Sequence, residues 1–288
     1  AIKQGSPIIP VYIHAPQQEG AWQRGGASNW WLHHALEDLD SQLQQQGGRL
    51  IIRASNNPLE TLTEIVRAHN VQSISWNRCY EPSQVKHDTI AKKALQDLGV
   101  ETQSTNGSLL LDPLSIRNKS GKPFQVFTPF WKHCKDFAPD QPETLAGNNF
   151  SPDVATDSLD SIELLPNIPW DKTMNSFWDP SRKGALKLLK EAILKSKSYE
   201  TLRDIPSTDG TSRLSPYLHF GQISPQEFFY TVREHCPNRE KADTGILRQL
   251  YWREFSVHLL YHFPHSQDLA LKPEYDRFPW NFNEQYLR

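Results

Sequence analysis

The sequence has little of several features that define common classes of protein. It contains three cysteines in 288 residues, Cys79, Cys134 and Cys236. They are odd in number, far apart and without metal-ligand spacing, so neither a disulfide framework nor a metal site is predicted, and a reducing, cytoplasmic location is expected. No apolar run approaches the length of about 18 residues that a membrane helix needs, and no signal peptide is recognisable.

The sequence also lacks an excess of positive charge. The formal net charge is −2, so any contact with nucleic acid would have to come from a local basic patch. The glycine-rich motif G-x-G-x-x-G is absent, which leaves nicotinamide-dinucleotide binding without support.

Strand and helix patterns alternate in the first third of the chain. Apolar, β-branched strands are predicted within 7–15, 49–55, 71–77 and 100–111, and helices within 28–43, 57–70 and 83–99. In the second helix, Leu59, Leu62, Ile65 and Val66 are expected to face inward, and Gly99 is expected to end the third helix. This alternation predicts an α/β fold with a parallel sheet covered by helices, which is a Rossmann-like domain over 1–135.

The amino-acid composition changes after residue 135. Residues 136–171 contain eight acidic residues, five prolines and no Lys or Arg, which predicts a linker over 136–177 lying on the surface, with a disordered insert as the alternative. From 178 to 288 the patterns are helical, and an all-α domain is predicted. Its first helix is basic, with seven Lys or Arg and two acidic residues between Arg182 and Arg203, which is also compatible with an ordinary solvated face.

The stretch DGTSRLSPYLHFGQISPQEFF, residues 209–229, predicts two helix starts. Ser215 and Ser224 each precede a proline, as expected for N-cap residues, and Glu227 completes a capping box with Ser224. The first start carries more than a cap requires. Its cluster consists of Thr211, Ser212, Arg213, Leu214 and Ser215, after Gly210, which would let the chain bend. Hydroxyls and free amides beside an arginine are suited to binding a phosphate.

The pattern of residues 246–263 predicts a long amphipathic helix. Its core stripe is Leu247, Tyr251, Phe255 and Leu259. The opposite face holds Gln249, Trp252, Arg253 and Ser256. An amide, an indole and a guanidinium on one face could hydrogen-bond and stack on a flat ring and pair with a phosphate, although a half-buried surface tryptophan is the alternative.

These motifs together resemble the photolyase/cryptochrome family. DGTSRLSPYLHFGQIS followed by RQLYWREF and HLLYHFP is similar to the flavin- and DNA-binding signature of that family. PVYIHAP, GGASNWWLHHALEDLDSQL, SWNRCYEP and VFTPFWK resemble its N-terminal antenna domain. The resemblance implies an α/β antenna domain, a linker and an all-α FAD domain that is incomplete in this chain, and it suggests that the chain is truncated at both ends.

The resemblance also implies roles for individual residues. Tyr199 and Thr211, Ser212, Arg213, Leu214 and Ser215 would contact FAD. Arg203, Gln249, Trp252, Arg253 and Ser256 would contact DNA, and Trp252 and Gln249 would act on the lesion. A folate antenna depends in the family on an Asn-Glu pair where this chain has Ser83 and Gln84, so methenyltetrahydrofolate, an 8-hydroxy-deazaflavin or no antenna remain open.

The implied activity is that of a deoxyribodipyrimidine photo-lyase, a monomeric enzyme that repairs cyclobutane pyrimidine dimers in UV-damaged DNA by electron transfer from reduced FAD. A glutamine at 249, where many dimer-specific photolyases have glutamate, leaves the lesion type open. The alternatives are a blue-light cryptochrome, a (6-4) photolyase, or a flavin-free nucleotide-binding module. The 288-residue chain alone is expected to bind FAD poorly and to repair nothing.

Overall fold

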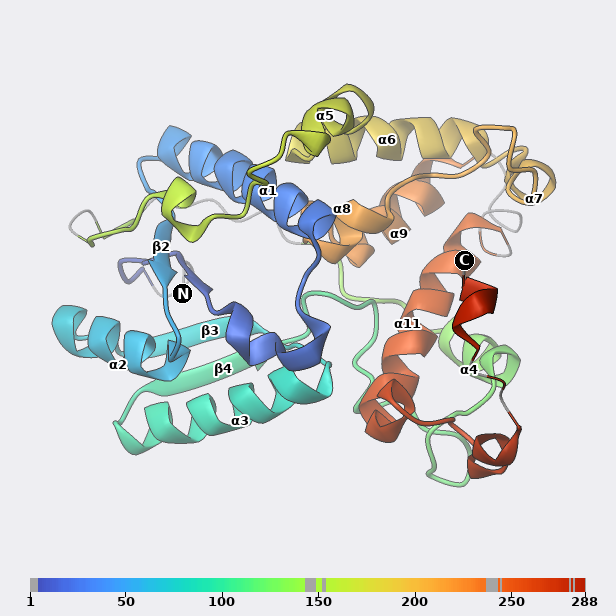
Figure 1. Cartoon of the computed structure of the whole chain (residues 1–288), viewed down its shortest axis with the longest axis horizontal. Coiled ribbons are helices and arrows are strands. Elements are labelled where there is room, and N and C mark those ends of the chain that lie inside the picture. Colours follow the sequence, from blue (N-terminus) through green and yellow to red (C-terminus); the bar gives the residue numbers. More distant parts are fainter. Residues whose placement is uncertain are drawn as a thin grey trace.

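The computed structural model describes residues 5–142, 149–151, 154–236, 243, 245–279, 281 and 283–287. Its N-terminal part alternates strands and helices, and its C-terminal part is helical (Figure 1). The predicted α/β order is confirmed. The elements of this part are β1 (Val11–His14), the 3-10 helix η2 (Pro16–Trp22), α1 (Gly26–Gln45), β2 (Ile51–Ala54), α2 (Pro58–His69), β3 (Ser73–Asn77), α3 (Pro82–Asp97) and β4 (Glu101–Thr105).

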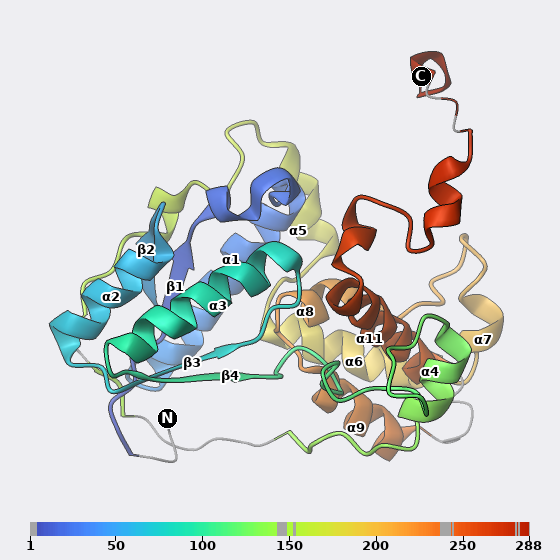
Figure 2. The same cartoon turned by 90° about the horizontal axis from the view of Figure 1, so that it is seen from below.

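The strands are parallel, as predicted, but they form two pairs and not one continuous sheet. Strand β1 pairs with β2, with Val11 opposite Ile51, and β3 pairs with β4, with Ser73 opposite Glu101 (Figure 2). Among the described residues, no strand is hydrogen-bonded to both pairs, and the structure therefore has two separate two-stranded sheets.

Each pair of strands has its own apolar cluster. Leu32 and Leu36 of α1 are buried against Leu50 and Ile52 beside β1 and β2. Val66 of α2 and Leu95 of α3 are buried with Val100 beside β3 and β4, and the half-buried Leu59, Leu62 and Ile74 pack on this cluster. The predicted inward face of α2 is thereby confirmed, with Ile65 also buried. Gly99 follows α3 in the left-handed conformation, with φ of 80°, as expected for the residue that ends a helix.

The helical part consists of short and medium helices. They are α4 (Phe127–Cys134), η3 (Leu159–Ile162), η4 (Trp170–Thr173), α5 (Met174–Phe177), α6 (Arg182–Lys195), α7 (Tyr199–Leu202), α8 (Ser215–His219), α9 (Pro225–His235), α11 (Ile246–His262), η5 (Pro264–Gln267), η6 (Pro273–Arg277) and η7 (Glu284–Leu287). No helix among the described residues is long and apolar enough to cross a membrane.

The largest core joins the two parts of the chain. Trp30 and Trp31 of α1 are buried in the same cluster as residues of α6, α8, α9 and α11. The Trp31 indole Nε1 donates a hydrogen bond to Gln222 Oε1 at 2.8 Å, and its ring meets Tyr217 edge-on with centroids 4.8 Å apart. Helix α1 therefore holds the helical part against the α/β part.

The acidic segment after residue 135 is more than a surface covering. Val154, Ile162 and Leu164 are buried, and the Asp157 amide donates to Ile52 O along the outer edge of β2. A few apolar residues therefore anchor this segment, whereas most of its described acidic residues are exposed, and the linker bounds 136–177 stay a prediction. Residues 143–148 and 152–153, which belong to this prediction, lie outside the described part.

Candidate functional site

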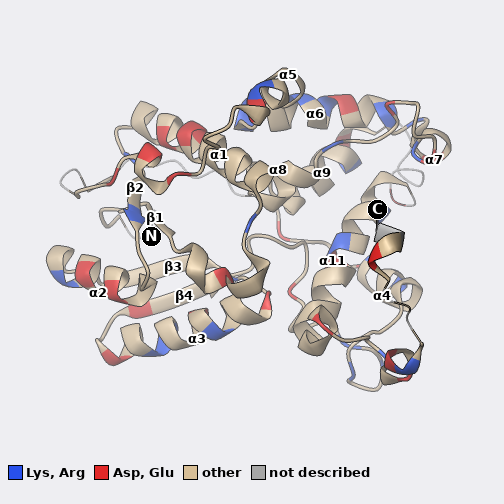
Figure 3. Ribbon diagram, viewed as in Figure 1, with Lys and Arg blue, Asp and Glu red and all other residues tan. Residues whose placement is uncertain are grey.

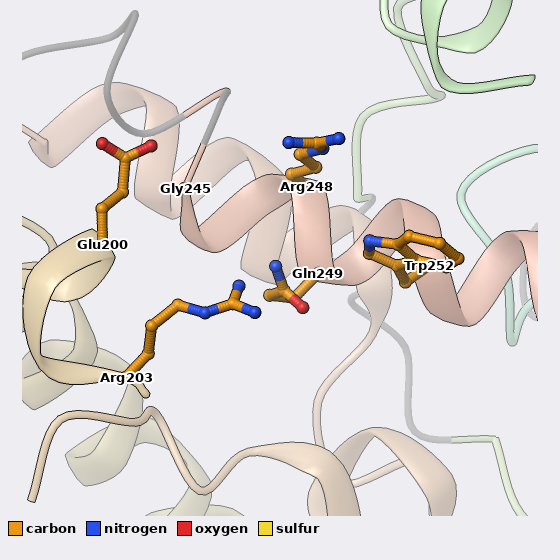
Figure 4. Close-up of a pocket in the computed structure, with 6 residues that line it drawn as sticks. All are labelled: Glu200, Arg203, Gly245, Arg248, Gln249 and Trp252. Atoms are coloured by element: carbon orange, nitrogen blue, oxygen red, sulfur yellow. The ribbon is translucent and has the colours of Figure 1, made fainter. Parts of the chain in front are cut away.

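A pocket of about 270 Å³ lies between α7 and the first half of α11 (Figure 4). Its lining includes Arg203, Gln249 and Trp252, three residues that the sequence had assigned to DNA contact. The other lining residues are Glu200, Gly245 and Arg248. The pocket thus combines arginines, an amide and an indole in one place, although they come from two separate helices.

Trp252 is the aromatic wall of this pocket. Its ring is stacked on Phe127 of α4, with centroids 3.5 Å apart and planes 10° from parallel. Phe127 is buried, whereas Trp252 is 43% exposed. One face of the indole is therefore covered by the protein, and the exposed remainder is available for a second flat ring.

Tyr199 is the first residue of α7, and Arg203 directly follows the last. Tyr199 is buried in the main core, and burial raises the pKa of its phenol. The Arg203 guanidinium carbon lies 5.7 Å from the centroid of the Tyr199 ring, and Arg203 Nε is 3.1 Å from Asp204 Oδ1. Tyr199 is not among the residues that line the pocket and instead lies beneath Arg203.

The other two residues of α11 that were predicted to contact DNA are engaged by the protein. Arg253 Nη1 donates to the carbonyl oxygen of Ser108 at 2.7 Å, and Ser256 Oγ donates to Trp252 O at 3.0 Å. Neither residue lines the pocket. The predicted core stripe of α11 is confirmed, because Leu247, Tyr251 and Phe255 are buried and Leu259 packs on the same cluster.

The sequence analysis missed Glu254, which is only 3% exposed. Its carboxylate accepts a hydrogen bond from the Leu111 amide at 3.3 Å and lies 3.4 Å from Arg253 Nη1. Burial raises the pKa of Glu254 to about 7 in spite of the nearby guanidinium. Its position, seven residues after Leu247 on a helix, was the available signal that it faces inward.

The loop before α8 differs from its prediction at two points. Helix α8 begins at Ser215 with Leu214 at the N-cap and no side-chain cap, so the prediction of Ser215 as N-cap is wrong. The chain bends at Arg213, with φ of 54°, while Gly210 is needed for close packing, because a Cβ there would lie 2.5 Å from Leu202 O. By contrast, Ser224 is confirmed as the N-cap of α9, where its Oγ accepts from the Glu227 amide.

Charges and hydroxyls gather in this loop. Asp209 accepts from Lys195 Nζ at 2.7 Å and lies 3.3 Å from Arg213 Nε, and the Lys195 hydrogen bond holds the pKa of Asp209 below its usual range. Ser212 Oγ accepts from the buried Leu214 amide. Thr211 and Ser215 are exposed, and their hydroxyls have no partner within the described part of the chain. Two cations facing one carboxylate, with free hydroxyls, can hold an anionic group.

Comparisons with known proteins identify the family of this chain. A sequence model described as DNA photolyase matches residues 1–146, and a deoxyribodipyrimidine photo-lyase of Agrobacterium fabrum is 36% identical over the whole chain. The chain belongs to the DNA photolyase family. It spans about 60% of the length of that relative. Cryptochrome-1 of Arabidopsis thaliana is 29% identical over the whole chain, which covers 44% of that protein.

Solved structures agree with this membership. A bacterial class III photolyase from Agrobacterium tumefaciens superposes on the whole chain with a TM-score of 0.89 at 34% identity, and the chain covers 60% of it. An archaeal photolyase from Sulfolobus tokodaii shares the fold, with a TM-score of 0.81 at 24% identity over 99% of this chain and 60% of that one.

The α/β part of this photolyase-family chain has a second cavity, of about 160 Å³. It lies where β1 and β2 end, and its lining includes His14, Ala54 and Asn56 together with Ser161 and Glu163 of the acidic segment. The carboxyl ends of parallel strands are the usual place for a ligand in this type of fold. Sequence reasoning did not find this cavity, because the acidic segment had been assigned to covering alone.

The sequence analysis also did not predict one group of three side chains that could ligate a metal ion. His33, His34 and Glu37 of α1 offer ligand atoms within 4.8 Å of one another. Ligands of one zinc ion at bonds of about 2.1 Å would be only about 3.4 Å apart. We therefore assign no metal to this cluster, and a helical His34–Glu37 contact of 3.2 Å accounts for part of it.

Proposed function

We propose that the complete protein is a deoxyribodipyrimidine photo-lyase that repairs cyclobutane pyrimidine dimers in UV-damaged DNA. The observation that carries this proposal is the half-exposed Trp252 stacked on Phe127 at 3.5 Å beside Gln249 and Arg203. A base taken out of the DNA stack needs an aromatic wall, a hydrogen-bonding group for its edge and a cation for its backbone. The pocket supplies all three.

Each of these residues has a defined part in lesion binding. Trp252 would stack on the extruded pyrimidines, and the Gln249 amide would hydrogen-bond their edges. Arg203 would pair with a phosphate, and Ser256 would contact the strand beyond the pocket. Arg253 would act indirectly, because its hydrogen bond to Ser108 O fixes the loop after β4 against α11.

The loop at residues 209–215 fits the phosphate tail of FAD. Helix α8 has only five residues, so the support comes from the side chains and not from a long helix dipole. Thr211, Ser212 and Ser215 would offer hydroxyls and Arg213 a guanidinium, while Leu214 anchors the loop in the core and Tyr199 supports Arg203 from below. When bound, reduced FAD supplies the electron whose transfer allows the cyclobutane ring to open.

The cavity at the ends of β1 and β2 suits an antenna chromophore. The structure of the Sulfolobus tokodaii photolyase is described as having two FAD molecules, with the implication of a novel light-harvesting cofactor. Histidine, asparagine and serine side chains would bind polar edges of such a chromophore here, whether a deazaflavin, a folate or a flavin. We further infer a monomeric, cytoplasmic enzyme, in keeping with three free cysteines, two of them buried.

Binding to irradiated DNA tests the proposal directly. We expect the chain to bind UV-irradiated oligothymidylate more tightly than the unirradiated strand in fluorescence anisotropy. Trp252→Ala should weaken this binding by about 5- to 150-fold, since stacking contributes about 1–3 kcal/mol per base. The control is Trp22→Ala, which removes an exposed indole outside the pocket. Equal binding by the two variants would contradict the proposed role of Trp252.

A cryptochrome is the second candidate, because a cryptochrome is similar over the whole chain. The two candidates differ in chemistry. A photolyase returns dimer-containing DNA to monomeric pyrimidines under blue light, whereas a photoreceptor leaves it unchanged. Repair measured with the complete protein separates them, and a (6-4) lesion as a parallel substrate identifies the lesion type.

A further inference from the structure

Arg248 lines the same pocket as Trp252. Its side chain leaves α11 on a different side from that of Gln249, which is the side that Arg203 approaches from the end of α7 (Figure 4). Its guanidinium carbon is 5.5 Å from the centroid of the Phe127 ring and 4.9 Å from that of Trp131. Both rings belong to α4, which is the helix that packs against α11. Aromatic contact of this kind holds a guanidinium by its faces and leaves its in-plane N–H groups available.

Arg248 has no anionic partner in the part of the chain that the structure describes. Other partly buried arginines do have one: Arg78 pairs with Asp112, Arg182 with Glu227 and Arg233 with Asp243. The Nε atom of Arg248 is buried without any hydrogen-bond partner. Since Nε is covered, an anion from outside the protein would have to be received by the terminal Nη groups, which form no ion pair with the described residues.

Phe127 connects this cation to the stacking surface. Its ring is stacked on Trp252 and also lies within cation–π distance of Arg248. A base on the exposed side of Trp252 would therefore place its sugar–phosphate chain within the region that Arg203 and Arg248 flank. In such a strand, the anions nearest to a stacked base are its own phosphodiesters.

We propose that Arg248 binds a backbone phosphate of the DNA strand whose base stacks on Trp252. This inference rests on the proposed function and adds a residue and a ligand group to it. The role of Phe127 and Trp131 is to position the guanidinium, so they act through Arg248 and not on the DNA. The pyrophosphate of FAD offers similar chemistry, and the experiment includes a separate measurement for it.

The test measures how binding depends on salt. The chain and its Arg248→Gln variant are titrated with a labelled single-stranded oligothymidylate at several salt concentrations. Loss of one phosphate contact should reduce the slope of log K against log salt by about 0.7 and weaken binding at low salt. Arg248→Lys should keep the slope because it keeps the charge. Arg67→Gln, which removes an exposed arginine of α2, should change neither quantity.

Each possible result decides between the explanations. Weaker binding with an unchanged slope, or unchanged binding, would overturn the assignment, since a merely structural arginine alters affinity without altering counterion release. A change confined to FAD titration, measured with the complete protein, would identify the flavin pyrophosphate as the ligand and would also overturn the assignment. If the unaltered chain bound no DNA even at low salt, this inference would fail, whereas the proposed function would still be decided by repair measured with the complete protein. Circular dichroism shows whether each variant keeps its helices.

Discussion

The buried Glu254 makes the stability of this chain depend on pH near neutrality. Its carboxylate lies between the amides of Leu110 and Leu111 and the Arg253 guanidinium, at the junction of α11 with the loop after β4. Because burial raises its pKa from 4.5 to about 7, the folded state binds this proton more tightly than the unfolded state does. Ionisation of Glu254 therefore lowers the free energy of unfolding. This loss is absent below the unfolded pKa, develops between the two pKa values and is complete above the folded pKa.

The size of the effect follows from the two pKa values. A rise from 4.5 to about 7 corresponds to about 3 kcal/mol of lost stability above pH 7. Between pH 5 and pH 8 the loss is about 2–3 kcal/mol. His258 acts in the opposite direction at lower pH, because burial lowers its pKa to about 4 and protonation of the unfolded chain below its ordinary pKa favours unfolding. Comparison with a Glu254 variant cancels this contribution.

The measurement is urea unfolding of the chain and of Glu254→Gln at several pH values from 5 to 8. The amide keeps an acceptor for the loop but cannot ionise. We expect the variant to gain stability relative to the unaltered chain by about 2–3 kcal/mol from pH 5 to pH 8. Glu60→Gln, at the exposed start of α2, serves as the control for replacing an exposed carboxylate by an amide. Parallel pH profiles for Glu254→Gln and the unaltered chain would refute the reasoning.

Two further predictions concern the segment at residues 202–227. Ser224→Ala should lower the free energy of unfolding by about 1 kcal/mol because it removes the acceptor for the Glu227 amide. Ser215→Ala removes no cap and should leave the free energy of unfolding nearly unchanged. Thermal unfolding distinguishes the two variants, and equal losses would contradict the assigned caps. Gly210→Ala should cost about 1–3 kcal/mol, because the new methyl group would meet Leu202 O at 2.5 Å, and a variant as stable as the parent would show that the loop can move away.

The same segment shows how far local patterns reach. The capping box at Ser224 and Glu227 involves residues three apart, so the sequence was sufficient to predict it. Ser215 has the same Ser-Pro pattern but a different outcome, since Gly210 packs on Leu202 and Arg213 takes the bend, which places Leu214 at the N-cap. A cap depends on backbone conformation, and here tertiary packing decided that conformation.

Sequence alone determined the alternation of strands and helices, the core stripe of α11 and the resemblance that led to the family. These features depend on neighbours within a few turns, where periodicity and short motifs carry the information. Tertiary structure alone decided that Arg253 is bound to Ser108, 145 residues away, that Phe127 covers Trp252, and that Arg248 lies over two rings of α4. Such contacts join segments that are remote along the chain, and only the packing of α4 and the loop after β4 against α11 brings them together. Figure 3 shows that this region carries scattered charges of both signs, so net charge gives no indication of the site.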